Sequence, residues 1–229
     1  MPVIHDEEFG TITVRRSARA TQVRLRVAPN GTLRASLPLY APLFLLKRLV
    51  KSSRPELRRM MEQATPDTVF HDGQQVGKSH TILVQPAPQL SVTVRKQHIL
   101  VALPSEKTMQ SSDVVRKVRD GVIAALRVEA KSYLPKRLSY LAAQHGLTYE
   151  KVRFSHASSR WGSCSSTGTI SLNIALMKLP FELIDYVLIH ELSHTKQMNH
   201  SQAFWQLVSQ GDPQYKQHRA RLKTEAPSL

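Results

Sequence analysis

The chain has 229 residues, enough for one large domain or two small ones with a substantial core. Hydrophobic residues make up 41% and aromatic residues 6%, an ordinary globular balance, and no apolar run is long enough to span a bilayer. Lys and Arg outnumber Asp and Glu by 32 to 17, which favours polyanionic partners such as nucleic acid or nucleotides. A solvated basic surface that only confers solubility is the alternative, because no RNA-binding signature accompanies the charge.

The compartment is suggested by the first residues and by the cysteine count. The segment from Met1 to Glu8 is acidic and lacks the basic and apolar regions of a secretory signal. Cys164 is the only cysteine, which excludes an intramolecular disulfide. These features favour a reducing cytoplasm and no membrane partner, and they leave the oligomeric state open.

Residues 10–40 alternate between apolar and polar side chains, which predicts β structure. Pro29-Asn30-Gly31 is a strong turn signal between two such runs. We therefore expect a β-hairpin whose strands cover residues 23–27 and 32–37.

A helical stretch follows from residue 43 to about residue 63, opened by Pro42. Pro55 is expected to kink this helix or to split it in two, because proline lacks the backbone N–H that a helix interior needs. One face of the stretch is basic, and the first sixty residues hold twelve Lys or Arg against four acidic residues. This part of the chain is the predicted site of contact with a polyanion.

The middle of the chain changes from strands to helices. Three alternating runs predict strands at 81–84, 91–94 and 99–103. Helical patterns then cover Ser112 to Leu134 and Pro135 to His145, the second closed by Gly146. We place a soft domain boundary near residue 110, with a β-rich region that includes a basic helix in 1–110 and a catalytic domain in 111–229.

The most informative segment is His190-Glu191-Leu192-Ser193-His194. Residues four apart lie on one face of an α-helix, so His190 and His194 can bind one metal ion. Glu191 is placed to act as general base on a water activated by that ion. Pro180 and the 3–4 spacing of the apolar residues after it predict a buried amphipathic helix. Two exposed histidines on an ordinary helix are the alternative.

His200 follows the second histidine by six residues and is the candidate third ligand. Three protein ligands leave one tetrahedral position open, which is typical of catalytic zinc sites, so Zn²⁺ is the predicted cofactor. Ser201 is a predicted N-cap for a helix over 202–208, which places His200 where the chain folds back. The alternative for His200 is a surface histidine.

The segment before the motif helix contains further candidates. Residues 160–168 are rich in glycine and serine and predict a turn, whereas 169–174 alternate like a strand, whose open edge could accept an extended peptide. Arg160 could supply positive charge to an oxyanion or a phosphate, although a structural ion pair is the commoner role. Cys164 is a candidate fourth metal ligand, or a thiol whose oxidation lowers the activity, although a small buried thiol without either role is commoner. Three aromatic residues are expected to pack in the core or between helices: Trp161, Phe204 and Trp205.

Together these residues resemble the YgjP-like family of predicted zinc metallopeptidases, relatives of the SprT-like proteins. The matching segments are Arg160 to Cys164, Ser171 to Asn173, His190 to His194, Asn199 to Ser201, and Phe204-Trp205. The likeness is strong from residue 150 to residue 206 and looser before that.

The resemblance implies an α+β protein with a β-rich N-terminal part followed by a helical, minimal zincin-like metallopeptidase domain. By position it implies that His190, His194 and His200 are the zinc ligands and that Glu191 is the base. Arg160 and Asn173 are the candidate substrate-binding residues.

The ligand spacing is also similar to that of the metzincins, which place glycine three residues after the second histidine. This chain has Gln197 at that position. The tight turn must therefore be made in another way, and Asn199 is the candidate.

We predict a zinc-dependent hydrolase, foremost a metallopeptidase that acts on a peptide or protein. One alternative is a nucleotide phosphohydrolase of the nucleoside triphosphate pyrophosphatase type, and another is a nucleic-acid-associated module with an idle zinc site. A peptidase needs a strand-edge cleft beside the metal, and a nucleotide enzyme needs Arg or Lys converging on it. A binding module needs a continuous basic face away from the metal.

Overall fold

The computed structural model describes residues 3–18, 20–27, 33–64 and 69–227. The chain divides into two compact units, Met1–Thr68 and Val69–Leu229, and the fold is α+β. The boundary at residue 68 differs from the change of composition near residue 110. The reason is that strands within residues 75–103 share one hydrophobic core with the helices that follow them. No helix in the described part of the chain has the length and apolar character needed to cross a bilayer.

The first unit contains a four-stranded sheet of order β1-β2-β4-β3 and two helices. Its elements are β1 (Val3–Asp6), β2 (Gly10–Arg16), β3 (Arg24–Val27), β4 (Leu33–Leu37), α1 (Leu43–Ser52) and α2 (Arg54–Ala64). The antiparallel pairing of β3 with β4 confirms the predicted hairpin, whose turn at Pro29-Asn30-Gly31 lies outside the described residues. Pro55 lies in the first turn of α2, so the predicted split of the helix is confirmed.

One face of this sheet packs against the helices because its strands alternate. The core consists of Ile12, Val14, Leu33, Ala35 and Leu37 from the sheet and Leu46, Val50 and Leu57 from the helices. Alternation directs the intervening residues of each strand to the opposite face of the sheet.

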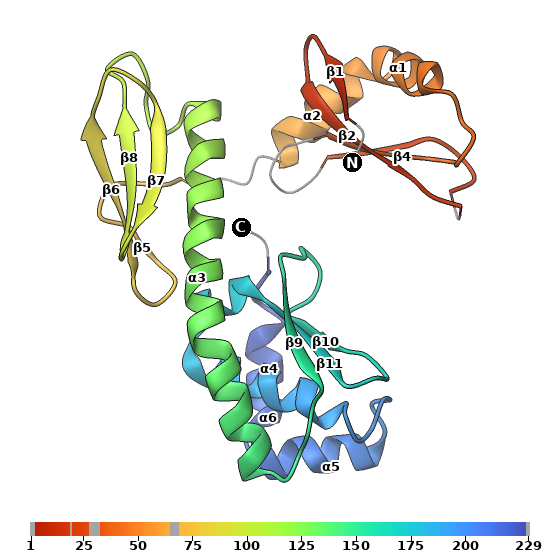
Figure 1. Cartoon of the computed structure of the whole chain (residues 1–229), viewed down its shortest axis with the longest axis vertical. Helices are drawn as coiled ribbons and strands as arrows, with labels where there is room; N and C mark the ends of the chain where they lie inside the picture. Colours follow the sequence, from red (N-terminus) through yellow and green to blue (C-terminus); the bar gives the residue numbers. More distant parts are fainter. Residues whose placement is uncertain (1–2, 19, 28–32, 65–68, 228–229) are drawn as a thin grey trace. The chain divides into compact units, whose positions relative to one another are not determined.

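The second unit is built along one long helix, α3 (Ser112–Gln144), drawn in green in Figure 1. The prediction of two helices that meet at Pro135 is wrong, because Pro135 lies inside this continuous helix. An apolar stripe runs past the proline without a change of phase: Leu126, Ala130, Leu134, Leu138 and Leu141 are all buried. This packing compensates for the one backbone hydrogen bond that proline cannot donate.

A sheet of order β5-β6-β8-β7 lies beside the N-terminal half of α3, and a sheet of order β10-β11-β9 lies near its C-terminal half with α4 to α6 (Figure 1). The first has strands β5 (Gln75–Val76), β6 (His80–Pro86), β7 (Ser91–Arg95) and β8 (His98–Leu103), which confirms the three predicted strands. The remaining elements are β9 (Lys151–Ser155), β10 (Gly162–Cys164), β11 (Thr169–Asn173), η1 (Ile174–Lys178), α4 (Phe181–Ser193), α5 (Gln202–Gly211) and α6 (Tyr215–Leu222).

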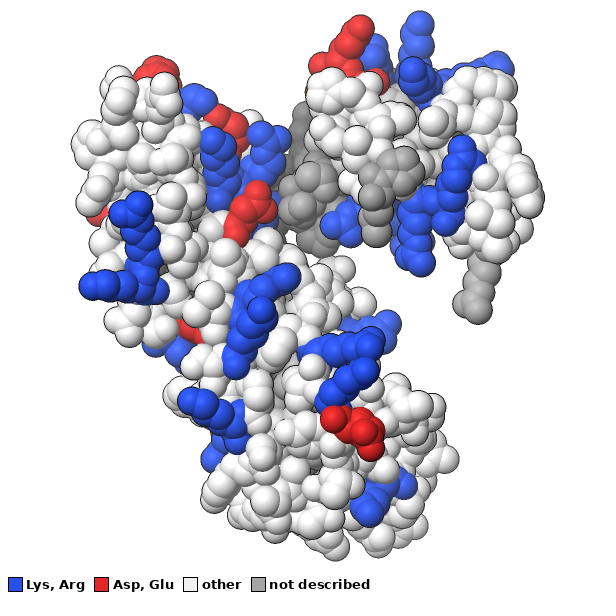
Figure 2. All heavy atoms as spheres, viewed as in Figure 1, with Lys and Arg blue, Asp and Glu red and all other residues white. Residues whose placement is uncertain are grey.

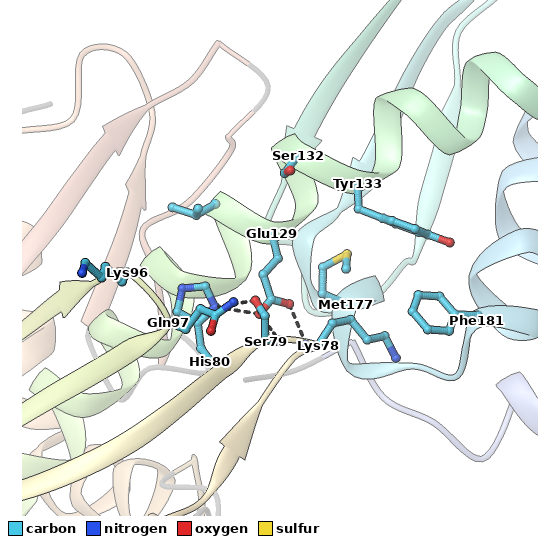
Figure 3. Close-up of a pocket in the computed structure, with 11 residues that line it drawn as sticks. Lys78, Ser79, His80, Lys96, Gln97, Glu129, Ser132, Tyr133, Met177 and Phe181 are labelled. Atoms are coloured by element: carbon cyan, nitrogen blue, oxygen red, sulfur yellow. Dashed lines mark hydrogen bonds and ion pairs between the residues drawn. The ribbon is translucent and has the colours of Figure 1, made fainter.

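Glu129 of α3 ties this helix to the turn between β5 and β6, as Figure 3 shows. Its carboxylate accepts hydrogen bonds from the backbone N–H groups of Lys78 (2.7 Å) and Ser79 (2.9 Å), and it lies 2.6 Å from His80 Nδ1. Gly77 has a φ of +62°, and a Cβ at this position would overlap the carboxylate. Burial raises the pKa of Glu129, but these hydrogen bonds together outweigh it and hold the pKa below its usual value.

Candidate metal centre

Three histidines meet at the C-terminal end of α4. His190 and His194 lie one turn apart there, and His200 lies just before α5. Each offers one ring nitrogen, and these atoms lie within 4.8 Å of one another. Nε2 of His190 and Nε2 of His200 are 3.2 Å apart, so the lone pairs of the three predicted ligands can converge on one cation.

The hydrogen bonding of His194 and the burial of His190 and His194 fit a divalent metal ion, whereas His200 is exposed. His194 Nδ1 lies 3.0 Å from the backbone carbonyl of Gln197; donation of Nδ1–H to it leaves the Nε2 lone pair for a metal. Burial lowers the pKa of His190 to about 3, and nearby positive charges act in the same direction. Burial also lowers the pKa of His194. Neutral imidazoles are the form that binds zinc, so the donor set suits this ion.

Cys164 lies outside the cluster formed by the three histidines. Its Sγ is a hydrogen-bond donor to the carbonyl of Ser165 at 3.4 Å, and burial raises the pKa of the thiol. It therefore fits the interpretation of a half-buried thiol better than that of a fourth ligand.

The turn after α4 is made without glycine and without a left-handed residue. Backbone N–H groups of Thr195 and Gln197 donate to the carbonyls of Leu192 and Ser193. Asn199, the candidate for this turn, has no positive φ, so it does not take the left-handed conformation that favours glycine. Gln197 instead contributes the carbonyl that orients His194.

Aromatic side chains from α5 hold the ligand rings. Phe204 is fully buried and stacks on His194 with ring centroids 4.5 Å apart. Trp205 stacks on His200 at 5.6 Å. Ser201 caps α5 by accepting a hydrogen bond from Phe204 N, as predicted. The packing role predicted for these aromatic residues is confirmed, and it limits the rotation of two of the three imidazoles.

Glu191 is almost completely buried next to the histidines, with 5% of its surface exposed. Its Oε2 has no hydrogen-bond partner among the described residues. Burial raises the pKa of this carboxyl to about 8, and the positive charge of Arg160 opposes that shift. Gly162 of β10 packs against the same carboxyl, because a Cβ there would lie 2.6 Å from Oε1. A buried carboxyl without a full set of hydrogen-bond partners, beside three histidine side chains, suits a site that binds a cation.

Strand β10 forms one edge of its three-stranded sheet and contacts α4. The sequence predicted a turn over 160–168, but Gly162–Cys164 pairs antiparallel with β11 and is therefore a strand. The open edge expected beside the motif helix thus belongs to β10 and not to β11, which is central in the sheet.

The two candidate substrate-binding residues occupy different environments. Arg160 is exposed and forms no salt bridge with a described residue. Its positive charge acts on Glu191 and partly opposes the rise in the pKa of that carboxyl. Asn173 is fully buried. Its Nδ2 donates to the carbonyls of Ala157 (2.6 Å) and Arg160 (2.9 Å), and its Oδ1 accepts from Ala175 N (3.0 Å). Asn173 therefore fixes the loop that carries Arg160 and has no surface with which to contact a substrate.

Residues 21–225 match the family described as YgjP-like, metallopeptidase domain. This chain belongs to the YgjP-like family. It is also similar to the metallopeptidase zymogen abylysin of Pyrococcus abyssi, with 30% identity, a TM-score of 0.37, and coverage of 39% of this chain and 91% of that one. The metallopeptidase zymogen jannalysin of Methanocaldococcus jannaschii is similar as well, with 18% identity and a TM-score of 0.35. That likeness covers 39% of this chain and 93% of jannalysin. No curated protein matches the chain.

Two residues near the metal centre of this YgjP-like chain were missed by the sequence analysis. Arg219 of α6 places its guanidinium 4.6 Å from the centroid of Trp205, and its charge contributes to the lowered pKa of His190. Tyr186 of α4 makes an edge contact with His190, with centroids 6.0 Å apart. The position of Tyr186 four residues before His190 was a usable signal. Arg219 gave no such signal, because only tertiary packing brings α6 to α4.

Proposed function

We propose that this metallopeptidase domain is a zinc-dependent peptidase in which His190, His194 and His200 bind the ion. The observation that carries the proposal is the convergence of three imidazole nitrogens beside a buried carboxyl group. A zinc ion with three protein ligands supplies a Lewis acid with one open position for water or substrate. All of these groups lie within 111–229, the part of the chain that we propose to be catalytic.

Glu191 is the proposed general base. It takes a proton from the water that attacks the peptide carbonyl, and it then delivers this proton to the leaving amine as the carbon–nitrogen bond breaks. Gly162 keeps the carboxyl in place from the side of β10. Arg160 is the proposed group that stabilises the negative charge developing on the carbonyl oxygen, and its exposure and its electrostatic effect on Glu191 support this role.

The proposed substrate is an extended segment of a peptide or protein. The open edge of β10 supports this class, because an extended peptide can add to a sheet edge through main-chain hydrogen bonds. Gly162 is both part of that edge strand and in contact with Glu191, so a segment bound along β10 lies beside the proposed base.

A nucleotide phosphohydrolase is the second candidate. Two arginines, Arg160 and Arg219, act electrostatically on Glu191 and His190 respectively, and guanidinium groups are suited to phosphate. The strand edge favours the peptidase, since it has no role in binding a nucleotide.

Turnover by purified zinc-loaded protein on unfolded proteins, peptides and nucleoside triphosphates tests both candidates. Glu191→Gln should keep the zinc, measured by elemental analysis, and lose about 10²–10⁴-fold in turnover. Glu182→Gln, which alters an exposed glutamate in the first turn of the same helix, is the matched control and should retain turnover. Cleavage of triphosphates alone would replace the peptidase by the second candidate, and wild-type rates for Glu191→Gln would contradict its role as base.

A further inference from the structure

The outer face of the N-terminal sheet, opposite the helices, carries a cluster of arginines. We call Arg15 of β2, Arg24 and Arg26 of β3, and Arg34 of β4 the arginine face. All four are exposed, whereas the residues that alternate with them, such as Val14, Leu25 and Ala35, belong to or pack on the core. On the side of the first unit that Figure 2 shows, Lys and Arg cover more of the surface than Asp and Glu. The strand period of two therefore gathers the four guanidinium groups on one side of one sheet.

The strand register places these arginines next to one another. Arg26 lies directly opposite Arg34. In the next row, Ser36 of β4 lies between Arg24 of β3 and Arg15 of β2. Like charges directly opposite each other destabilise a sheet, so this arrangement has a cost when nothing else is bound.

Nearby carboxylates do not offset that charge. Asp6 and Glu8 form ion pairs with Arg54 and Arg58 of α2 instead. None of the four guanidinium groups has an ion pair or a side-chain hydrogen bond with a residue that the structure describes. Arg16, the neighbour of Arg15, differs in this respect, because it donates to the carbonyls of Leu39 (2.6 Å) and Ala41 (2.8 Å).

A pocket of about 280 Å³ opens at one end of the arginine face. Its lining includes Arg15 and Arg24 together with Ser17, Thr21, Gln22 and Ser36. Two guanidinium groups with hydroxyl and amide groups around them form a donor-rich site without a carboxylate, and such donors suit a phosphate group.

We propose that the arginine face binds the phosphate backbone of a nucleic acid. The four arginines lie in two rows of the sheet, so they cover a larger area than one small anion can contact. Such a surface suits a polymer with regularly spaced negative charges. The described residues of this face include no Phe, Tyr or Trp, so binding should use phosphate contacts without base stacking and should show little sequence preference. The large exposed apolar side chain of Phe44 belongs to α1, which packs on the other face of the sheet, and this disfavours insertion of the arginine face into a membrane.

The proposal does not depend on the peptidase, and full-length protein tests it. Fluorescence anisotropy would measure binding of labelled single- and double-stranded DNA and RNA of mixed sequence at about 50 and 200 mM salt. The test variant replaces the arginine face with glutamine: Arg15→Gln, Arg24→Gln, Arg26→Gln and Arg34→Gln. The control variant removes the same charge from exposed positions of α1 and α2: Lys47→Gln, Arg48→Gln, Lys51→Gln and Arg59→Gln. Circular dichroism and zinc content establish that both variants remain folded.

Four phosphate contacts predict that wild-type affinity falls about 100-fold between these two salt concentrations. The test variant should bind at least about 10-fold more weakly than wild type at low salt, with most of the salt dependence lost, and the control variant should stay within about 3-fold of wild type. Equal losses in both variants would overturn the proposal, because they would reflect net charge alone. Absence of wild-type binding at low salt would overturn it too, as would arginine-face-dependent binding to anionic lipid vesicles or acidic peptides in place of nucleic acid.

Discussion

The backbone of Gly162 lies directly against the carboxyl group of Glu191. A Cβ at position 162 would be 2.6 Å from Oε1 and 2.8 Å from Cδ of Glu191. These two residues are far apart in the sequence, and the contact joins the edge strand β10 to the helix that carries the histidines. Glycine at this position therefore sets where the proposed base stands relative to the proposed substrate edge.

Gly162→Ala should lower turnover by about 100-fold, because a displacement of a catalytic group by about 1 Å costs that much. The histidines are not touched, so the zinc content should stay at the wild-type level. Steady-state rates and elemental analysis of the same preparations measure both quantities. Ser163→Ala, the next residue of β10, is the matched control, and a Gly162→Ala variant with normal rates would show that the contact does not position Glu191.

His200→Ala should weaken zinc retention by at least about 100-fold, since the loss of an outer hydrogen-bond partner alone costs about 10–100-fold. His190 and His194 then hold the ion from a single helix. Competition with a chromophoric chelator gives the affinity directly. The exposed His98 of β8 supplies the control variant His98→Ala, and equal zinc affinity in the two variants would remove His200 from the proposed ligand set.

Asn173→Ala should reduce the free energy of unfolding by about 2–3 kcal/mol, because buried groups lose their hydrogen-bond partners. The same change releases the loop that carries Arg160, so turnover should fall while zinc content stays unchanged. Urea unfolding followed by tryptophan fluorescence is suitable, since Trp161 and Trp205 are the only two tryptophans and both lie in the second unit. The exposed Asn199 gives the control Asn199→Ala, for which a change below about 0.5 kcal/mol is expected.

Glu129 should make the second unit sensitive to acid. Burial raises its pKa, but the hydrogen bonds from His80, Lys78 and Ser79 outweigh it, and the folded-state pKa lies below the usual 4.5. The folded state therefore binds fewer protons at this carboxyl than the unfolded state, so its contribution is complete above about pH 4.5 and is lost as the pH falls through the folded value.

Glu129→Gln should lower the free energy of unfolding by about 1–3 kcal/mol at neutral pH and should lose less stability than wild type between about pH 5 and pH 3. Urea unfolding at several pH values measures both effects. Glu106→Gln, at an exposed position, is the control and should keep the wild-type pH dependence. Identical acid profiles for wild type and Glu129→Gln would exclude this carboxyl as the source of the sensitivity.

Local features of the structure were predictable because they depend on nearby residues. The start of α4 after Pro180, the cap at Ser201 and the split at Pro55 each follow from backbone groups within one turn. The helical period also places His190 and His194 on one face without reference to the rest of the chain. The sequence alone therefore predicted His190 and His194 as ligands together with their relative geometry. It predicted His200 as the third ligand without its position in space.

Relationships between distant segments were decided only by the tertiary structure. Pro135 stays inside α3 because the buried stripe continues past it, although local rules favour a break. Gly162 meets Glu191, and Glu129 meets the turn at Gly77, only because strands and helices pack at those places. The arginine face likewise depends on strand register, which side-chain alternation within single strands does not specify. Local preference is set by bonds within a turn, whereas long-range contacts depend on the packing of whole elements, and no single segment carries that information.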